Sequence, residues 1–498
     1  MNSKKIFLAV DLGASSGRLI AGSLSSTGFE LEEIHRFPNQ GVRAGNRLLW
    51  DWLGLWQHIK DALRIAGNRF KGDEIVSVGV DTWGVDFSLM GKDGDVIGSP
   101  ICYRDSQTQG IFEEAFKVCR REEIFDRTGL QFIEFNSLFQ LYAIKKRNPE
   151  LLDQAERFLM MPDLFHWLLC GEMTNESTDA STSQLIDPRT IDWASDVIEK
   201  FGIPTEIFGE IVQPGTSIGK LRPELADELG LPQIQVVVPA SHDTASAVAA
   251  VPVQSEALPT PNWCYVSSGT WSCVGVELQS PRINQVVGDL NFTNEGGVEG
   301  TTRLLKNVAG MWLVQECRRI WEREGREFDW ENLVRLAEDS PRLGSHVPPD
   351  HPELMAPANM PQAIASICEA TGQTPPADEG QMIRCTLESI SLRYRMVLEW
   401  LEQITEASID RIHIVGGGTQ NRLLNQLAAD ATGREVITGP IEATAIGNLM
   451  MQMVGAGELA NVTEGRQMVA NNFPLETYEP GNEDGWDEAY EKFKKIAD

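Results

Sequence analysis

The sequence has few of the residues that build metal centres or disulfide frameworks. Its 498 residues include eight cysteines, none in a C-x-x-C pair, and seven histidines, with no H-E-x-x-H motif. Cysteines scattered through a large acidic chain are typical of buried thiols, so we expect no disulfide framework. The lack of a Cys/His cluster with metal spacing argues against a zinc site built by the protein.

Positive charge and long apolar runs are also scarce. Lys and Arg total 43 and Asp and Glu total 72, which gives a net charge of −29. Binding to nucleic acid needs a basic face, so this charge argues against a nucleic-acid partner. No run of 18 apolar residues and no basic-then-apolar leader is present, so we expect neither a membrane span nor a secretory signal. These absences favour a cytoplasmic enzyme of small molecules, without a membrane, nucleic-acid or obligatory protein partner.

Two strand candidates between residues 236 and 276 each end in a polar turn. The first ends in Ser241-His242-Asp243-Thr244, where a β-branched run gives way to small residues that start a helix. Asp243 is therefore expected at the carboxyl end of a strand, beside a helix N-terminus. The second places Ser267-Ser268-Gly269-Thr270 between two apolar halves, which predicts a hairpin whose turn offers backbone N–H groups to a ligand.

The beginning of the chain has the same pattern. Residues 4–24 read as a strand, a turn of glycine and serine, and a second strand, with Asp11 at the end of the first. Ser15-Ser16-Gly17 and Ser267-Ser268-Gly269 therefore look like two copies of one hairpin that grips phosphate.

Length, composition and this repeat predict two α/β lobes with a nucleotide cleft between them. A chain of this length with 42% hydrophobic residues favours two or more domains. We expect a first lobe over 1–250 with a substrate pocket and an inserted helical cap, a hinge over 251–261, and a second lobe over 262–498 with the nucleoside site.

Periodicity predicts sheet with intervening helix along the chain. Gly84 interrupts a strand pattern, and from spacing it is either a bulge glycine or a place where a ligand lies against the backbone. The expected elements are a strand over 29–37, a helix around 52–63, a helix-rich insertion over 106–230, helices over 305–325 and 380–405, a strand over 411–415 followed by Gly416-Gly417-Gly418 and a helix, and a helix over 441–455 that completes the second lobe.

Three residues have both a chemical and a structural interpretation. Asp243 is a candidate general base or a helix N-cap. His242 is a substrate contact or a hydrogen-bonded structural histidine. Asp11 either holds Mg²⁺ through water, since this ion keeps much of its hydration shell, or caps a turn.

Several motifs together resemble the FGGY carbohydrate kinase family, within the actin-like ATPase superfamily. They are DLGASSGR near the start, SHDTAS in the middle, SSGTW after the break, and IVGGGTQN near the end. DTWGVDF, CYRDS, NEGGVEG and LLKNVAGMWLVQE are similar to the branch of that family that acts on L-rhamnulose. No motif matches in residues 324–379.

The resemblance implies two actin-like (ribonuclease H-like) lobes and transfer of the γ-phosphoryl group of ATP, with Mg²⁺, to the 1-hydroxyl of L-rhamnulose. It implies a catalytic base at Asp243, and it leaves the metal ligands unassigned. The implied ATP contacts are Ala14, Ser15, Ser16, Gly17, Arg18, Thr270, Gln315 and Gly417, and the implied sugar contacts are Gly84, His242, Asp243, Thr244 and Asn307.

Two other functions fit the same pattern. One is a kinase of another ketose or polyol, such as L-fuculose, xylulose or glycerol. The other is an actin-like ATPase or sugar sensor that transfers no phosphoryl group, because fold does not fix function. Asp243 beside a capped pocket favours a kinase, since a sensor needs no base aimed at a sugar hydroxyl.

Overall fold

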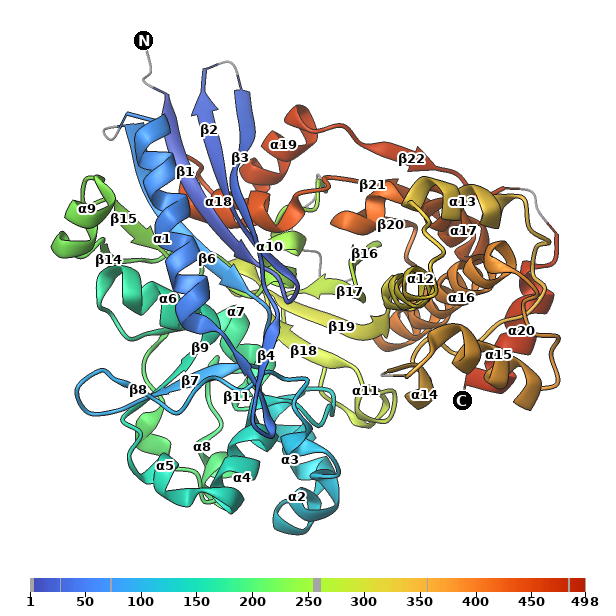
Figure 1. Ribbon diagram of the computed structural model, residues 1–498, viewed down its shortest axis with the longest axis horizontal. Helices are drawn as coiled ribbons and strands as arrows, with labels where there is room; N and C mark the ends of the chain where they lie inside the picture. The colour runs from blue at the N-terminus through green and yellow to red at the C-terminus, as the bar shows by residue number, and fades with distance from the viewer. Residues whose placement is uncertain are drawn as a thin grey trace. The chain divides into compact units, whose positions relative to one another are not determined.

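The computed structural model describes residues 4–26, 28–71, 74–253, 261–355, 357–481 and 484–497 (Figure 1). The chain divides into two compact units. Unit 1 comprises Met1–Ala257, Glu277–Leu304 and Ala443–Asn472, and unit 2 comprises Leu258–Val276, Leu305–Glu442 and Phe473–Asp498.

The units differ from two contiguous halves. Residues 277–304 and 443–472 belong to unit 1, although the sequence places them after the expected hinge. Residues 254–260 of that hinge lie outside the described part of the chain. The helix expected over 441–455 is present as α18 (Ala443–Gly455), but it packs in unit 1 and does not complete the second lobe.

A six-stranded sheet in the order β14-β15-β6-β1-β2-β3 forms the centre of unit 1. Strands β1, β2 and β3 form an antiparallel meander, while β6 runs parallel to β1 and to β15. The helices of the unit are α1 (Trp52–Arg69), α2 (Phe112–Val118), α3 (Arg121–Thr128), α4 (Ser137–Arg147), α5 (Pro149–Asp153), α6 (Met161–Cys170), α7 (Ser177–Ala180), α8 (Ser195–Lys200), α9 (Pro223–Leu229), α10 (Asp243–Ala249), α11 (Gln285–Asp289), α18 and α19 (Val462–Asn472). Its strands are β1 (Lys5–Leu12), β2 (Ser16–Ser25), β3 (Gly28–Pro38), β4 (Gly41–Ala44), β5 (Arg47–Trp50), β6 (Ile75–Thr82), β7 (Phe87–Met90), β8 (Val96–Ile97), β9 (Arg157–Met160), β10 (Asn175–Glu176), β11 (Ile186–Asp187), β12 (Asp192–Trp193), β13 (Ile211–Val212), β14 (Ser217–Lys220), β15 (Gln235–Val237) and β18 (Thr293–Gly296).

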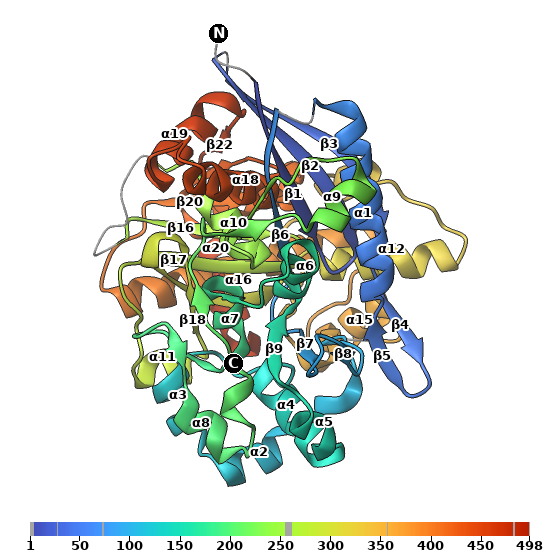
Figure 2. The same ribbon diagram turned by 90° about the vertical axis from the view of Figure 1, so that its left-hand side faces the viewer.

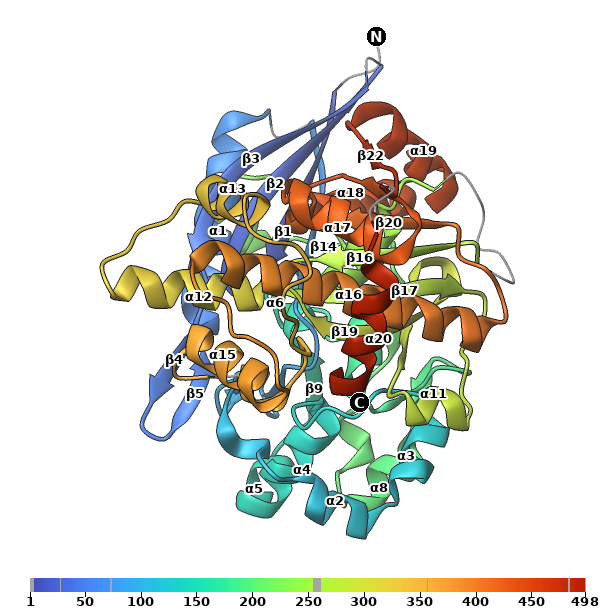
Figure 3. The same cartoon turned by 90° about the vertical axis from the view of Figure 1, so that its right-hand side faces the viewer.

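The side chains of β1 point alternately to the two faces of this sheet, and both faces are buried. Ile6, Leu8 and Val10 pack into a core with α1 and α6. Phe7 points to the opposite face and pairs with Gly22, where a side chain would press against Leu449 of α18. Helices α1 and α18 therefore cover opposite faces of the sheet (Figure 3). Parallel strands buried on both faces are typical of α/β folds.

The insertion expected over residues 106–230 is helical, as predicted, with short strands between the helices. Helices α2, α3, α4, α5 and α8 gather at one end of unit 1 (Figure 2). A turn after β7 joins it to β8, and β9 completes a three-stranded sheet.

In unit 2, β16 and β17 form the second predicted hairpin, and β20 and β21 extend the sheet in parallel from β16. The long helix α16 is buried along most of its length, and α17 and α20 pack against it (Figure 3). The strands β17 and β19 run from one unit into the other. The elements are β16 (Trp263–Ser268), β17 (Trp271–Leu278), β19 (Thr302–Ala309), α12 (Trp312–Arg323), α13 (Trp330–Glu338), α14 (Pro352–Met355), α15 (Met360–Ala370), α16 (Glu379–Thr405), β20 (Arg411–Val415), α17 (Arg422–Thr432), β21 (Glu435–Thr438), β22 (Glu476–Tyr478) and α20 (Trp486–Ala497).

The helix predicted over residues 305–325 is wrong in its first part. Residues up to Ala309 belong to β19, and α12 begins only at Trp312. Gly310 explains the break, because a side chain there would press against Ser272 of β17. None of the helices in the described ranges is both long and apolar enough to cross a membrane.

Candidate functional site

Three carboxylates lie at one edge of the unit 1 sheet. Asp11 and Asp81 are direct partners in the parallel register of β1 and β6. Thr82, the next residue of β6, forms a parallel bridge with His242, which precedes Asp243. The carboxyl ends of adjacent strands thus bring Asp11, Asp81 and Asp243 together, at the position where open α/β sheets bind ligands.

Asp243 is the first residue of α10, and His242 occupies the N-cap position. The interpretation of Asp243 as the N-cap is therefore wrong. Its Oδ1 accepts a hydrogen bond from the Thr244 hydroxyl at 3.1 Å and lies 3.5 Å from Nε2 of His242. Both of these contacts fall on Oδ1, and 33% of the side chain is exposed. The carboxylate is therefore held through Oδ1 and stays accessible to a substrate.

The pKa of Asp243 lies above its ordinary value. Burial is the main cause; His242 acts in the opposite direction, and repulsion from Asp11 adds to the rise. A carboxylate with a raised pKa accepts a proton more readily, so this environment suits a general base.

His242 also contacts a buried ion pair on β18 and β19. Nη2 of Arg303 lies 3.2 Å from Nδ1 of His242 and 3.1 Å from Oε2 of Glu295. The Glu295 oxygen is 3.4 Å from the same ring nitrogen. Burial acts to raise the pKa of Glu295, but Arg303 and His242 outweigh it, and the pKa lies below its usual range.

Asp81 is the most deeply buried of the three acids. Its Oδ2 accepts a hydrogen bond from Asn448 of α18 at 2.6 Å, while its Oδ1 has no partner among the described residues. Burial and repulsion from Asp11 raise the pKa of Asp81 well above its ordinary value, although Asn448 opposes the rise. Asp11 is paired with Arg18 at 2.8 Å.

These acids fit a hydrated divalent cation. A buried carboxylate oxygen without a partner and repulsion between neighbouring acids are both relieved by added positive charge. The described residues contain no group of three or more His, Cys, Asp or Glu side chains placed to hold a metal ion. A cation that keeps most of its waters needs only one or two protein carboxylates.

Gly84 lies in a strained turn after β6. A side chain at Gly84 would clash with Thr182, whose hydroxyl accepts a hydrogen bond from the Val85 N–H at 2.9 Å. Val85 has a φ of 68°, which is rare for a β-branched residue. Strain of this kind persists where the surroundings fix it, and it gathers at ligand sites.

The N-terminal turn has the hairpin form expected for Ala14 to Arg18. The Gly13 N–H donates to the Ser16 carbonyl at 2.9 Å, and Ser15 at the tip is exposed. Gly17 sits against Phe37, where even a methyl group would clash. Arg18 of β2 reaches across the hairpin to the carboxylate of its register partner on β1, Asp11.

Unit 2 brings together two of its predicted ATP contacts. The Thr270 hydroxyl lies in the β16–β17 turn and donates to Oε1 of Gln315 on α12 at 3.2 Å. Gly418 packs on Ser268, whereas nothing lies within 4 Å of the space a side chain at Gly417 would fill. Asn307 on β19 accepts a hydrogen bond from the Cys273 thiol at 3.1 Å.

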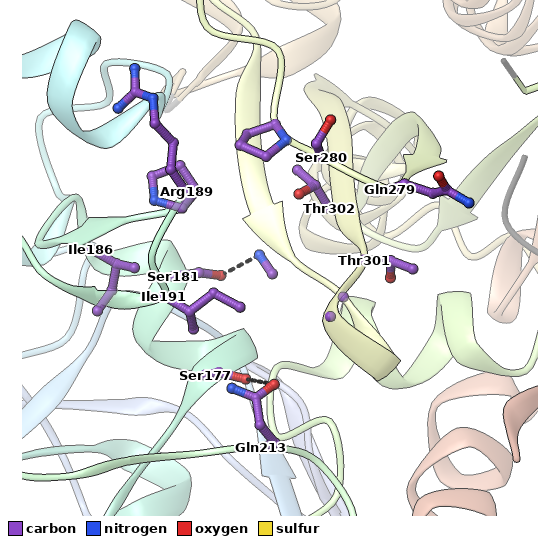
Figure 4. Close-up of a pocket in the computed structure, with 15 residues that line it drawn as sticks. Ser177, Ser181, Ile186, Arg189, Ile191, Gln213, Gln279, Ser280, Thr301 and Thr302 are labelled. Atoms are coloured by element: carbon purple, nitrogen blue, oxygen red, sulfur yellow. Dashed lines mark hydrogen bonds between the residues drawn. The ribbon is translucent and has the colours of Figure 1, made fainter. Parts of the chain in front are cut away.

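A separate cavity of about 150 Å³ lies in unit 1, and Gly296 at the end of β18 is among the residues that line it (Figure 4). The Ser181 hydroxyl accepts a hydrogen bond from the Gly296 N–H there, and the Ser177 hydroxyl contacts the Gln213 side chain. None of the predicted site residues is among those that line the cavity.

Known proteins resemble this chain along nearly its whole length. Residues 6–250 match the N-terminal domain, and residues 264–456 the C-terminal domain, of the FGGY family of carbohydrate kinases. The chain is 45% identical over 494 residues to a rhamnulokinase from Bacteroides thetaiotaomicron, covering 99% of this chain and 100% of that protein. The chain belongs to the FGGY family. It is also 36% identical over 475 residues to a rhamnulokinase from Bacillus subtilis, covering 95% of each chain.

Solved structures of sugar kinases have the same fold as this FGGY chain. A ligand-bound xylulose kinase from Lactobacillus acidophilus superposes with a TM-score of 0.79 at 15% identity, over 99% of this chain and 96% of that one. A Plasmodium falciparum glycerol kinase with ADP gives a TM-score of 0.75 at 13% identity, over 99% and 97%. The predicted actin-like α/β fold is confirmed, and the chain is a carbohydrate kinase.

Sequence reasoning did not single out Asp81, Glu295, Arg303 or Asn448. Asp81 and Glu295 stand inside the DTWGVDF and NEGGVEG motifs, so a closer reading of these motifs would have marked them. Arg303 and Asn448 carried no such signal, because their partners are distant in the sequence.

Proposed function

We propose that this FGGY kinase transfers the γ-phosphoryl group of ATP to the 1-hydroxyl of L-rhamnulose, giving L-rhamnulose 1-phosphate and ADP. The choice of sugar rests on the relatives named rhamnulokinase, which are 36–45% identical over nearly the full chain. The chemistry rests on one observation: Asp243 keeps a carboxylate oxygen available at the edge of the sheet.

In the proposed reaction, Oδ2 of Asp243 takes the proton of the sugar hydroxyl while the hydroxyl oxygen attacks the γ-phosphorus. The bond from this phosphorus to the bridging oxygen of ADP breaks. Phosphoryl transfer has a loose transition state, so the protein mainly positions the two substrates and excludes water. His242, Thr244, Gly84 and Asn307 are the proposed sugar contacts together with Asp243.

The proposed ATP contacts lie in the two glycine-serine turns, in Gln315 and in Gly417. Their backbone N–H groups suit an anionic phosphate chain. Mg²⁺ would supply further positive charge to the phosphates when bound, and Asp11 and Asp81, which are register partners on β1 and β6, would hold its waters. The residues proposed to contact ATP are Ala14, Ser15, Ser16, Gly17, Arg18, Thr270, Gln315 and Gly417.

The test is kcat/KM with ATP and Mg²⁺ on L-rhamnulose, L-fuculose, xylulose and glycerol, with sugar phosphate and ADP both measured. L-Rhamnulose should lead, because a mismatched hydroxyl leaves buried polar groups unpaired at about 1–3 kcal/mol each. Preference for xylulose or glycerol would overturn the choice of sugar. Release of ADP without sugar phosphate would favour an actin-like ATPase or a sensor.

A further inference from the structure

Arg303 is a fully buried cation whose contacts converge on His242. Its Nε donates to the Gly296 carbonyl at 2.8 Å, which ties the side chain to the end of β18. Its Nη2 lies between Oε2 of Glu295, at 3.1 Å, and Nδ1 of His242, at 3.2 Å. Burying a charge is costly, so a guanidinium held in this way has little freedom to turn elsewhere.

The geometry points to Arg303 and Glu295 as positioning residues that hold the proton of His242 on Nε2, facing Asp243. A guanidinium only donates hydrogen bonds. Two groups lie near Nδ1 of His242, and the contact with hydrogen-bond geometry is that of Nη2 of Arg303, so Nδ1 offers its lone pair there. Oε2 of Glu295 is 3.4 Å from the same nitrogen but makes no hydrogen bond with any described residue. The proton of a neutral imidazole then lies on Nε2, because the bond at one ring nitrogen fixes the state of the other.

A proton on Nε2 of His242 affects the carboxylate of Asp243. Nε2 of His242 is 3.5 Å from Oδ1 of Asp243, so its N–H turns positive charge toward that oxygen. The Thr244 hydroxyl donates to the same Oδ1. The His242 N–H and the Thr244 hydroxyl therefore both hold Oδ1, which leaves Oδ2 for the sugar hydroxyl. This step rests on the proposed function, in which Asp243 is the base.

A purely structural ion pair would have different effects, and unit 1 contains one for comparison. Arg466 and Glu277 form a buried pair at 2.9 Å, with side chains 5% and 2% exposed. Arg466 also donates to the carbonyl groups of Val248 and Ala249, much as Arg303 donates to Gly296. The two pairs match in chemistry and burial, whereas the Arg303–Glu295 pair also contacts His242.

The first test reads the histidine ring in the unmodified enzyme. Protein labelled with ¹⁵N-histidine is studied by two-bond ¹H–¹⁵N NMR, and the His242 signals are assigned by their loss in His242→Gln. We expect the neutral form of His242 to carry its proton on Nε2. A proton on Nδ1, or an equal mixture of the two forms, would overturn the inference. This readout does not depend on the role of Asp243.

The second test removes both charges of each pair, so that no unpaired ion stays buried. The double variant Glu295→Gln/Arg303→Met should lose kcat about 10- to 100-fold, as expected for a misplaced reacting group, with little change in KM for ATP. The control Glu277→Gln/Arg466→Met should keep kcat near that of the wild type. Equal losses in both variants, or no loss in the first, would contradict the inference. If the first variant does not fold, the NMR result decides.

Failure of the proposed function has a separate signature. Near-normal kcat in Asp243→Asn would remove the base assignment, whereas the proton position on His242 would stand as measured.

Discussion

Asp243 is the residue on which the proposed chemistry depends. Asp243→Asn keeps the size and the hydrogen bond from Thr244 but cannot accept the sugar proton. We expect kcat to fall by about 10²- to 10⁴-fold while ATP affinity persists. Steady-state kinetics, nucleotide titration and melting temperature on one preparation test this. A near-normal kcat would show that Asp243 is not the base.

The pH dependence of kcat/KM should follow the same carboxylate. Asp243 accepts a proton only when ionised, so activity is lost as pH falls through its pKa. Because that pKa is raised above 3.8, mainly by burial, the acidic limb should begin at a higher pH than for an ordinary aspartate. The residual activity of Asp243→Asn should lack this limb; an unchanged limb would assign it to another group.

Asp86 should make folding stability depend on pH. Burial raises its pKa from 3.8 to about 6, although Trp50, Gln140, Tyr103 and Trp83 all donate to it. Because the pKa is higher in the folded than in the unfolded protein, protonation of Asp86 stabilises the folded state. This contribution to the free energy of unfolding is complete below about pH 4 and is lost as the pH rises through about 6. The shift corresponds to about 3 kcal/mol.

Denaturant unfolding between pH 4 and 7 tests the role of Asp86. Asp86→Asn should remove this part of the pH dependence, because asparagine does not titrate. Asp93→Asn, at an exposed position in the following turn, should keep the wild-type profile. Identical profiles for wild type and Asp86→Asn would show that Asp86 does not titrate in this range.

At the scale of elements, α10 and α18 pack so closely that only glycine fits at one contact. A β-carbon at Gly447 would lie 1.8 Å from the Ser246 carbonyl oxygen, a backbone atom that cannot turn away. We expect Gly447→Ala to destabilise the protein by about 3 kcal/mol, at the upper end of usual overpacking costs. The chemical denaturation midpoint measures this.

Gly344→Ala is the matched control, since nothing lies within 4 Å of its new methyl group. It should change stability by less than about 0.5 kcal/mol. Equal midpoints for the two variants would mean that α18 moves to accommodate the methyl group.

The sequence predicted the helices and strands better than it predicted their boundaries or their tertiary contacts. The two hairpins, the strand at β20 and the helix at α16 were visible because their periodicity or turn chemistry is local. The strand β19 was missed because LLKNVA carries no clear period, and its pairing with β17 is a tertiary contact. The same reason applies to the site: Asp11 and Asp243 end recognisable strands, whereas Arg303 acquires its role only through folding.

At the scale of the whole molecule, the first unit is completed by a late part of the chain. Gln452 of α18 donates to the Leu8 carbonyl of β1 at 3.0 Å, and Asn448 donates to Asp81 of β6. No local pattern could reveal this, because residues 443–455 read equally well as a helix of either unit.

A truncation series tests whether α18 and α19 are needed to complete unit 1. A chain ending at Glu442 lacks both helices, so one face of the sheet loses its cover and the amides of β1 and β6 should exchange hydrogen much faster. A chain ending at Asn472 lacks only residues assigned to unit 2, and those amides should keep their protection. Hydrogen exchange in both truncated chains is measured by mass spectrometry of peptides from residues 5–12 and 75–82. If protection is equal in the two truncated chains, then β1 and β6 are stable without α18, and the sheet would owe its stability to the helices α1 and α6 on its other face.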